Sequence, residues 1–125
     1  MRILLDTHVL LWTLADDPHL SKDARKIIEA ATEIYVSSAS YWEIAIKAGL
    51  GKLPVNLPEI RLAAQSSGFN ELPISGEHTE ALLKLADHHR DPFDRMLVAQ
   101  AISEPMRLLT ADAQVAKYTE LATLV

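Results

Sequence analysis

The stretch "RILLDTHVLLWTLA", residues 2–15, contains the change of pattern that decides the fold. Residues 2–5 form a short apolar run that ends at Asp6, which is typical of a buried strand followed by a polar turn. Residues 7–15 then carry apolar side chains at the spacing of a helix, at Val9, Leu10, Trp12 and Leu14. The chain is therefore predicted to begin with a strand that passes directly into a helix packed against it.

The remainder of the chain repeats this order of strand and helix. Further strands are predicted at residues 33–38, 69–75, 106–110 and 123–125. Helices are predicted after Ser21 as N-cap, from about Ser40 to the glycines at 49–51, from Pro58 to Gly68, over residues 77–88, from Pro92, and from about Asp112. Alternating strands and helices indicate βαβ units. The predicted fold class is α/β, a three-layer α/β/α sandwich with a mainly parallel sheet of four to five strands.

The length and composition predict one ordinary globular domain, residues 1–125. Hydrophobic residues make up 49% of the chain and charged residues 23%. The N-terminus lacks the long apolar segment of a signal peptide or a membrane span, and the absence of cysteine excludes disulfides and thiolate chemistry. We therefore expect a cytoplasmic protein that does not enter a membrane.

The net charge is −5, from 12 basic and 17 acidic residues. This balance argues against a surface that coats nucleic acid by charge alone. It does not exclude nucleic acid as a substrate, because a carboxylate site acquires local positive charge when a divalent cation binds.

Four acids occupy equivalent places in the predicted fold. Asp6 follows the first strand, Glu43 the second and Asp112 the fourth, while Asp94 lies in the first turn of the helix that begins at Pro92. Sites in parallel sheets lie beyond the carboxyl ends of the strands. We therefore expect these four side chains to converge on one edge of the sheet.

Helix capping is the alternative interpretation of each acid. Asp91, Pro92 and Asp94 fit an N-cap, a proline in the first turn and an acid at the third helical position. Ser40 and Glu43 have the spacing of a capping box. Taken singly, each acid fits the structural role better, but capping does not require four carboxylates to meet.

If the carboxylates meet, they repel one another, and a divalent cation relieves that repulsion. Magnesium and manganese suit a site of carboxylate oxygens, whereas zinc prefers histidine and cysteine. Such a site can activate water and stabilise the charge that develops on a phosphodiester. Hydrolysis by metal-activated water is therefore the predicted chemistry.

Four segments resemble the PIN domain family, in particular the VapC toxins of bacterial toxin–antitoxin pairs: "ILLDTHVLLW", "SSASYWEIAIKAGLGKL", "HRDPFDRMLVAQA" and "LLTAD". The resemblance implies a small ribonuclease that binds Mg²⁺ or Mn²⁺ and cleaves RNA. It implies catalytic and metal-binding roles for Asp6, Glu43, Asp94 and Asp112, and supporting roles for Asp91, Thr7 and Ser38. It also implies a homodimer and a VapB-like antitoxin whose tail covers the acidic groove.

Two arginines flank the acidic segment and are candidate RNA contacts, Arg90 and Arg95. For Arg95 the alternative is an ion pair with Asp91, and Lys47 has the same spacing from Glu43. The local ion pair is the favoured interpretation in both cases. If Glu43 binds a metal ion, Lys47 could adjust or lock the empty site.

The aromatic residues and histidines also have two interpretations each. Trp12 and Trp42 are assigned to the core rather than to a partner surface, because both lie in apolar helices. His88 and His89 are assigned to a solvated helix end, since adjacent helical residues point in different directions. His8 could touch substrate but is given no role.

Two other functions remain as alternatives. A non-catalytic PIN-like module that only binds a partner would be expected to lose an acid, yet all four positions are acidic. A phosphatase-like site with a phosphorylated aspartate would carry a second aspartate two residues after Asp6, where this chain has His8.

Overall fold

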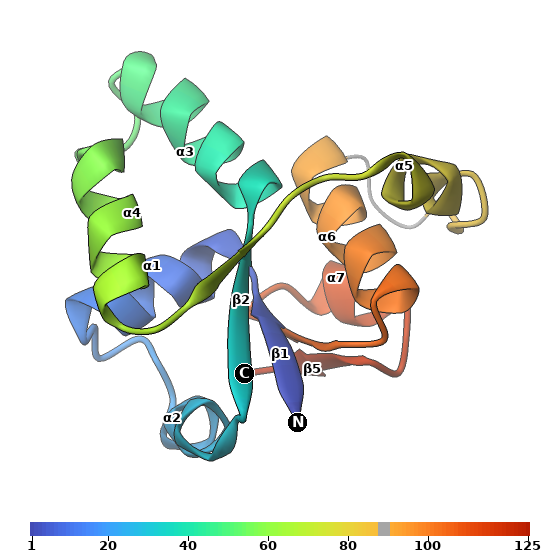
Figure 1. The fold of residues 1–125 in the computed structure, drawn as a ribbon, viewed down its shortest axis with the longest axis horizontal. Helices are drawn as coiled ribbons and strands as arrows, with labels where there is room; N and C mark the ends of the chain where they lie inside the picture. The colour runs from blue at the N-terminus through green and yellow to red at the C-terminus, as the bar shows by residue number, and fades with distance from the viewer. Residues whose placement is uncertain (88–90) are drawn as a thin grey trace.

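The computed structural model describes residues 1–87 and 91–125, and in this part of the chain a parallel sheet of five strands forms the centre (Figure 1). The strand order is β3-β2-β1-β4-β5. The strands are β1 (Arg2–Leu5), β2 (Glu33–Ser37), β3 (Asn70–Leu72), β4 (Arg107–Thr110) and β5 (Ala122–Leu124). The predicted α/β class and parallel sheet are confirmed, and all five predicted strands are present, some of them shorter than expected.

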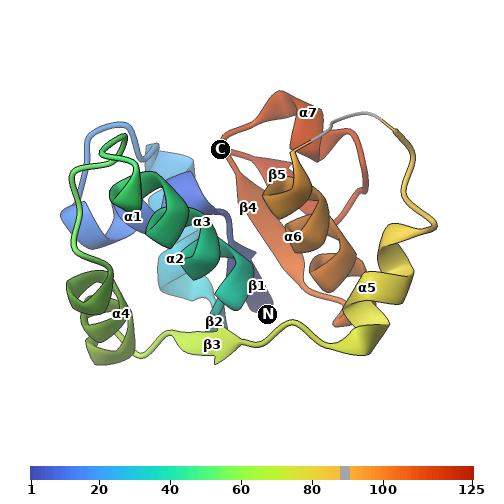
Figure 2. The ribbon, with the colours of Figure 1, turned by 90° about the horizontal axis from the view of Figure 1, so that it is seen from above.

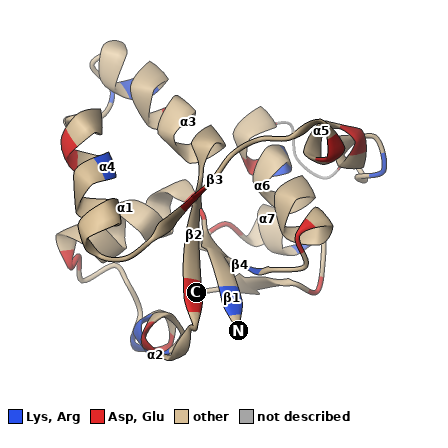
Figure 3. Ribbon diagram, viewed as in Figure 1, with Lys and Arg blue, Asp and Glu red and all other residues tan. Residues whose placement is uncertain are grey.

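The central strand β1 carries apolar side chains that are buried on both faces of the sheet. Ile3, Leu4 and Leu5 are all fully buried. Alternate strand residues point to opposite faces. Leu4 accordingly packs in one core cluster with Leu97, while Ile3 and Leu5 pack in the other with Leu10. Charged residues of β1 and β2 stand only at their N-terminal ends, at Arg2 and Glu33 (Figure 3).

Helices occupy both sides of the strands. They are α1 (Thr7–Ala15), α2 (Lys22–Ala30), α3 (Ser38–Gly49), α4 (Leu57–Ser66), α5 (Gly76–Leu82), α6 (Pro92–Ser103) and α7 (Ala113–Ala116). In Figure 1, α1, α2 and α4 lie on one side of the strands, and α5, α6 and α7 on the other. Helices α3 and α6 lie side by side and contact each other (Figure 2).

Several helix starts have the caps that the sequence predicts. The Ser21 side chain accepts a hydrogen bond from the backbone N–H of Ala24, and Asp91 caps α6 just before Pro92. Gly68 follows α4 with a φ of +82°, the left-handed region in which glycine ends helices readily.

The predicted start of α3 is wrong. The helix begins at Ser38, and the side chain of Ser37 accepts from the N–H of Ala39 at 2.9 Å. Ser37 is both the last residue of β2 and the N-cap of α3, so the strand passes into the helix without a loop. Ser40 therefore lies within the first turn and Glu43 in the second, so the predicted capping box between them does not form.

The predicted end of the helix over residues 77–88 is also wrong, because α5 ends at Leu82. Beyond it, the N–H groups of Leu83, Lys84 and Leu85 each bond to the carbonyl three residues back. This tighter pattern is typical of a helix end. The assignment of His88 and His89 to a helix end lies outside the described residues, as does Arg90.

Candidate active site

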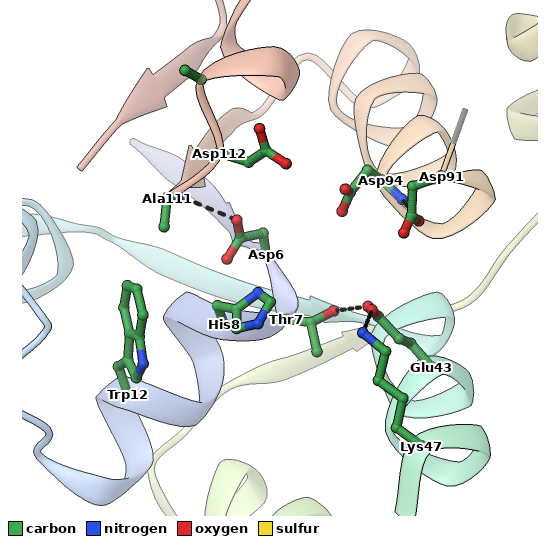
Figure 4. A pocket seen from close by; sticks show the side chains of 11 residues that line it. Asp6, Thr7, His8, Trp12, Glu43, Lys47, Asp91, Asp94, Ala111 and Asp112 are labelled. Atoms are coloured by element: carbon green, nitrogen blue, oxygen red, sulfur yellow. Dashed lines mark hydrogen bonds and ion pairs between the residues drawn. The ribbon is translucent and has the colours of Figure 1, made fainter. Parts of the chain in front are cut away.

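A pocket of about 510 Å³ opens at the carboxyl ends of the central strands (Figure 4). The structure brings all four predicted acids into it, together with Asp91 and Thr7. The lining residues are Asp6, Thr7, His8, Trp12, Glu43, Lys47, Asp91, Asp94, Ala111, Asp112 and Ala113. These residues lie in four helices, α1, α3, α6 and α7, or at most two residues before the start of one.

Asp6 is the most enclosed of the aspartates in the pocket, with 4% of its surface exposed. Its Oδ1 accepts from the N–H of Val9 at 2.8 Å, which caps α1, and its Oδ2 accepts from the N–H of Ala111 at 3.1 Å. Burial raises the pKa of Asp6, although hydrogen bonds from Val9, Thr110 and Ala111 and the nearby His8 act in the opposite direction. A cation in the pocket would favour its ionised form.

Glu43 is equally buried and has a partner on each carboxylate oxygen. The Thr7 hydroxyl donates to Oε1 at 2.7 Å, and the Lys47 ammonium donates to Oε2 at 2.6 Å. The hydrogen bond to Glu43 raises the pKa of Lys47, burial lowers it, and the charges of Glu43, Asp91 and Asp94 raise it further. The predicted pair between Lys47 and Glu43 is confirmed.

Two other acids of the pocket also begin helices. Asp91 Oδ1 accepts from the N–H groups of Phe93 at 2.9 Å and Asp94 at 3.0 Å. Asp112 accepts from the N–H of Gln114 at 2.8 Å at the start of α7. Capping and a place in the pocket are therefore compatible, since the same carboxylates do both.

The donor atoms of the pocket fit magnesium or manganese by type, because all five acids offer carboxylate oxygen. Within residues 1–87 and 91–125, however, no three histidine or acidic side chains stand in the arrangement of a complete ligand set. Magnesium usually keeps several water ligands and uses only one or two carboxylates. The acids therefore fit a hydrated ion rather than one enclosed by protein atoms.

His8, for which no role is predicted from the sequence, is exposed and lines the pocket. Trp12 also lines it, and the centroids of its ring and that of His8 lie 6.1 Å apart. The spacing of four residues, which places two side chains on one helix face, could have identified this pair. Trp12 is partly buried, as a residue at the edge of the core would be.

Trp42 does not belong to the core. It is 59% exposed, and its ring meets that of Phe93 edge-on at 5.1 Å between centroids. The core assignment of Trp42 is therefore wrong, because this position of α3 faces outward beside the start of α6.

Two further predicted residues lie outside the pocket lining. Ser38 is half-buried at the first position of α3. The guanidinium of Arg95 donates to the carbonyl of Ala86 at 3.0 Å and to the hydroxyl of Tyr118 at 3.1 Å. These contacts fix Arg95 against the segment after α5 and near α7, and its contact with RNA stays a prediction.

A parallel α/β sheet with acids gathered at its carboxyl edge is the arrangement expected of a PIN domain. Residues 3–121 match the model of the PIN domain, and the chain belongs to this family. The family predicted from the sequence is therefore confirmed, and membership leaves the phosphatase-like alternative without support.

Among named relatives, the chain is similar to Ribonuclease VapC22 of Mycobacterium tuberculosis (strain ATCC 25618 / H37Rv). The two are 30% identical over 112 residues, which cover 88% of this chain and 86% of that protein.

Solved structures share the fold at lower identity. The structure of VapBC2 from Rickettsia felis, bound to a DNA fragment from its promoter, has a TM-score of 0.69 and 16% identity, over 100% of this chain and 98% of that one. A toxin–antitoxin complex from Klebsiella pneumoniae has a TM-score of 0.68 and 18% identity, over 97% and 95% of the two chains.

Proposed function

We propose that this chain is a metal-dependent endoribonuclease of the VapC type, the toxin of a toxin–antitoxin pair. The observation that carries the proposal is the convergence of Asp6, Glu43, Asp94 and Asp112 on one pocket. The identity to Ribonuclease VapC22 supports the same activity. A non-catalytic module would have no need to keep four carboxylates together against their mutual repulsion.

The four acids are the residues that would hold Mg²⁺ or Mn²⁺, with Asp91, Thr7 and Ser38 in supporting roles. When bound, the ion supplies Lewis acidity, the usual means of activating water against a phosphodiester. Thr7 holds the carboxylate of Glu43 in one orientation through its hydrogen bond. The N–H groups of Val9 and Ala111 do the same for Asp6.

The surrounding helices favour the ionised acids and an anionic substrate. Asp6 and Asp112 cap α1 and α7, and Asp94 lies in the first turn of α6. The N-terminal end of a helix carries partial positive charge that stabilises a nearby carboxylate or phosphate. Arg90 and Arg95 are the proposed RNA contacts.

The proposed protein partner is a VapB-like antitoxin. The Rickettsia and Klebsiella structures with the same fold are a VapBC assembly and a toxin–antitoxin complex. The tail of such a partner would cover the acidic pocket, and it would extend into a second, more apolar groove that adjoins this pocket and shares His8 and Trp12 with it.

We propose a homodimer or a toxin–antitoxin hetero-oligomer that acts in the cytoplasm. Over the described residues, every helix is too short or too polar to cross a bilayer.

The test is RNA cleavage by purified protein that is free of antitoxin. Transfer, ribosomal and messenger RNAs are incubated with Mg²⁺ or Mn²⁺, and cleavage sites are identified by sequencing RNA ends. Cleavage should disappear with EDTA and in Asp6→Ala, while circular dichroism shows that the variant stays folded. Sequencing RNA ends after brief expression in cells, beside Asp6→Ala, would then identify the natural substrate. Intact RNA across the whole panel would favour a partner-binding module.

A further inference from the structure

The acidic pocket contains its own cation. The Nζ atom of Lys47 lies 2.6 Å from Oε2 of Glu43, and Lys47 lines the pocket together with Asp91 and Asp94 (Figure 4). Of the described residues that line the pocket, it is the one lysine or arginine. Its position follows from the sequence, because residues four apart on a helix face each other across one turn.

This ion pair changes what Glu43 can offer to a metal ion. One carboxylate oxygen already accepts the Thr7 hydroxyl at 2.7 Å, and the other accepts the Lys47 ammonium. Only 5% of the Glu43 side chain is exposed, so the carboxylate has little freedom to turn toward another partner. In the described part of the chain, no three acids or histidines form a complete ligand set.

We propose that Lys47 is the internal counter-ion of the metal-free pocket: its ammonium occupies Glu43 until a divalent ion displaces it, and so sets the ion concentration at which the pocket fills. This inference rests on the proposed function, in which Glu43 is a metal ligand. Lys47 is then a positioning residue that acts through Glu43.

Displacement is physically accessible because the pair is only half enclosed. The Lys47 side chain is 42% exposed, and its flexible stem allows the ammonium to move into solvent. A half-exposed ion pair contributes little net stability, since water and salt weaken it. An ammonium and a divalent ion that share Glu43, Asp91 and Asp94 also repel each other, so the two cations compete.

The test compares Mn²⁺ binding by wild-type protein and Lys47→Met, measured by calorimetry and by electron paramagnetic resonance of the free ion, without RNA. We expect Lys47→Met to bind Mn²⁺ about three- to tenfold more tightly. Lys47→Arg keeps the charge and should not show this gain. Lys26→Met removes a charge from the exposed face of α2 and serves as the matched control, with wild-type affinity expected.

Unchanged or weaker binding by folded Lys47→Met would overturn the proposal, since it would mean that Lys47 orients Glu43 for the ion or has no influence on it. Lys47→Gln provides the same comparison if the methionine variant does not fold. Absence of Mn²⁺ binding in both wild type and variant would overturn it as well. RNA cleavage by the wild type is scored separately, so an active enzyme with unchanged Lys47→Met affinity loses this inference and keeps its proposed function.

Discussion

The hydroxyl of Thr7, at the start of α1, donates to Oε1 of Glu43, in the second turn of α3, over 2.7 Å. The same hydroxyl oxygen lies 3.1 Å from the hydroxyl of Ser40. All three side chains are buried. This contact joins α1, which Asp6 caps, to α3, which contains Glu43. Thr7 therefore has a defined structural role.

Replacement of Thr7 by valine should destabilise the protein and weaken metal binding. Valine keeps the volume but leaves a buried carboxylate oxygen without its donor, which typically costs about 1–3 kcal/mol of unfolding free energy. Urea denaturation measures this loss, and Mn²⁺ titration measures the binding. Thr7→Ser retains the hydroxyl and should bind Mn²⁺ more nearly as the wild type does. Equal Mn²⁺ affinity in Thr7→Val and wild type would show that Glu43 does not depend on this contact.

Divalent ions should stabilise the folded protein, because a ligand that binds only the native state raises its stability by mass action. At an Mn²⁺ concentration about 100 times Kd the gain is about 2.7 kcal/mol. In a domain of this size that corresponds to a rise in Tm of roughly 5–15 °C. Differential scanning fluorimetry should show the rise, and EDTA should reverse it.

Asp94→Asn is the informative variant for that experiment, since asparagine is similar in shape and lacks the charge. We expect its Tm to respond to Mn²⁺ much less than that of the wild type. A full response in Asp94→Asn would remove this residue from the proposed ligand set.

Acidification should reveal the burial of Asp6. Its folded pKa is raised by burial, so the folded state holds the proton more tightly than the unfolded chain does. The free energy of unfolding should therefore rise as the pH falls below the raised folded pKa, and level off near the ordinary pKa of about 3.9. Between about pH 7 and about pH 4, metal-free wild type should gain stability relative to Asp6→Asn.

Urea denaturation at several pH values, without divalent ions, measures that difference. The asparagine also disturbs the hydrogen bond from Ala111, but this effect is the same at every pH. Only the slope against pH reports the ionisation of Asp6. Parallel curves for the two proteins would contradict the prediction.

A buried histidine outside the pocket should affect stability alone. His78 is 1% exposed, its Nδ1 accepts from the N–H of Ser75 at 2.9 Å, and its Nε2 lies 2.7 Å from Oε2 of Glu104. Because Nδ1 accepts a hydrogen bond, the neutral ring carries its proton on Nε2 and donates it to Glu104.

His78→Ala should lose about 2–4 kcal/mol of unfolding free energy, measured by urea denaturation. Glu104→Gln keeps an acceptor for Nε2–H and should lose about 1 kcal/mol or less. Both variants should retain wild-type Mn²⁺ affinity at temperatures where they are folded. A change in that affinity would show that the α5–α6 contact is coupled to the pocket.

The order of elements was predictable because apolar strands such as Arg2–Leu5 and capping residues such as Ser21 and Asp91 are local signals. The convergence of the acids was also predictable, since parallel strands bring their carboxyl ends to one edge. The start of α3 was not, because both Ser37 and Ser40 are good caps and only the end of β2 decides between them.

The outward position of Trp42 and the place of His8 in the pocket depend on how helices are rotated against the sheet. That rotation is fixed by contacts between distant segments, such as the one between Trp42 and Phe93. The partners of Arg95, Ala86 and Tyr118, are likewise brought to it by tertiary structure. The sequence of a single helix does not contain this information.

Asp6, Asp91 and Asp112 each line the pocket and cap a helix, which has a consequence for the mutations that would inactivate the proposed toxin. These aspartates each begin a helix, and asparagine can also cap a helix, so a single-nucleotide change from Asp to Asn removes the charge while preserving the start of the helix. Glu43 does not cap a helix, so a replacement at this position does not have to preserve a helix start. The test is to overexpress the protein, select cells that survive and still accumulate it, and sequence the gene. We expect asparagine to predominate at the three aspartates and a wider choice of residues at position 43.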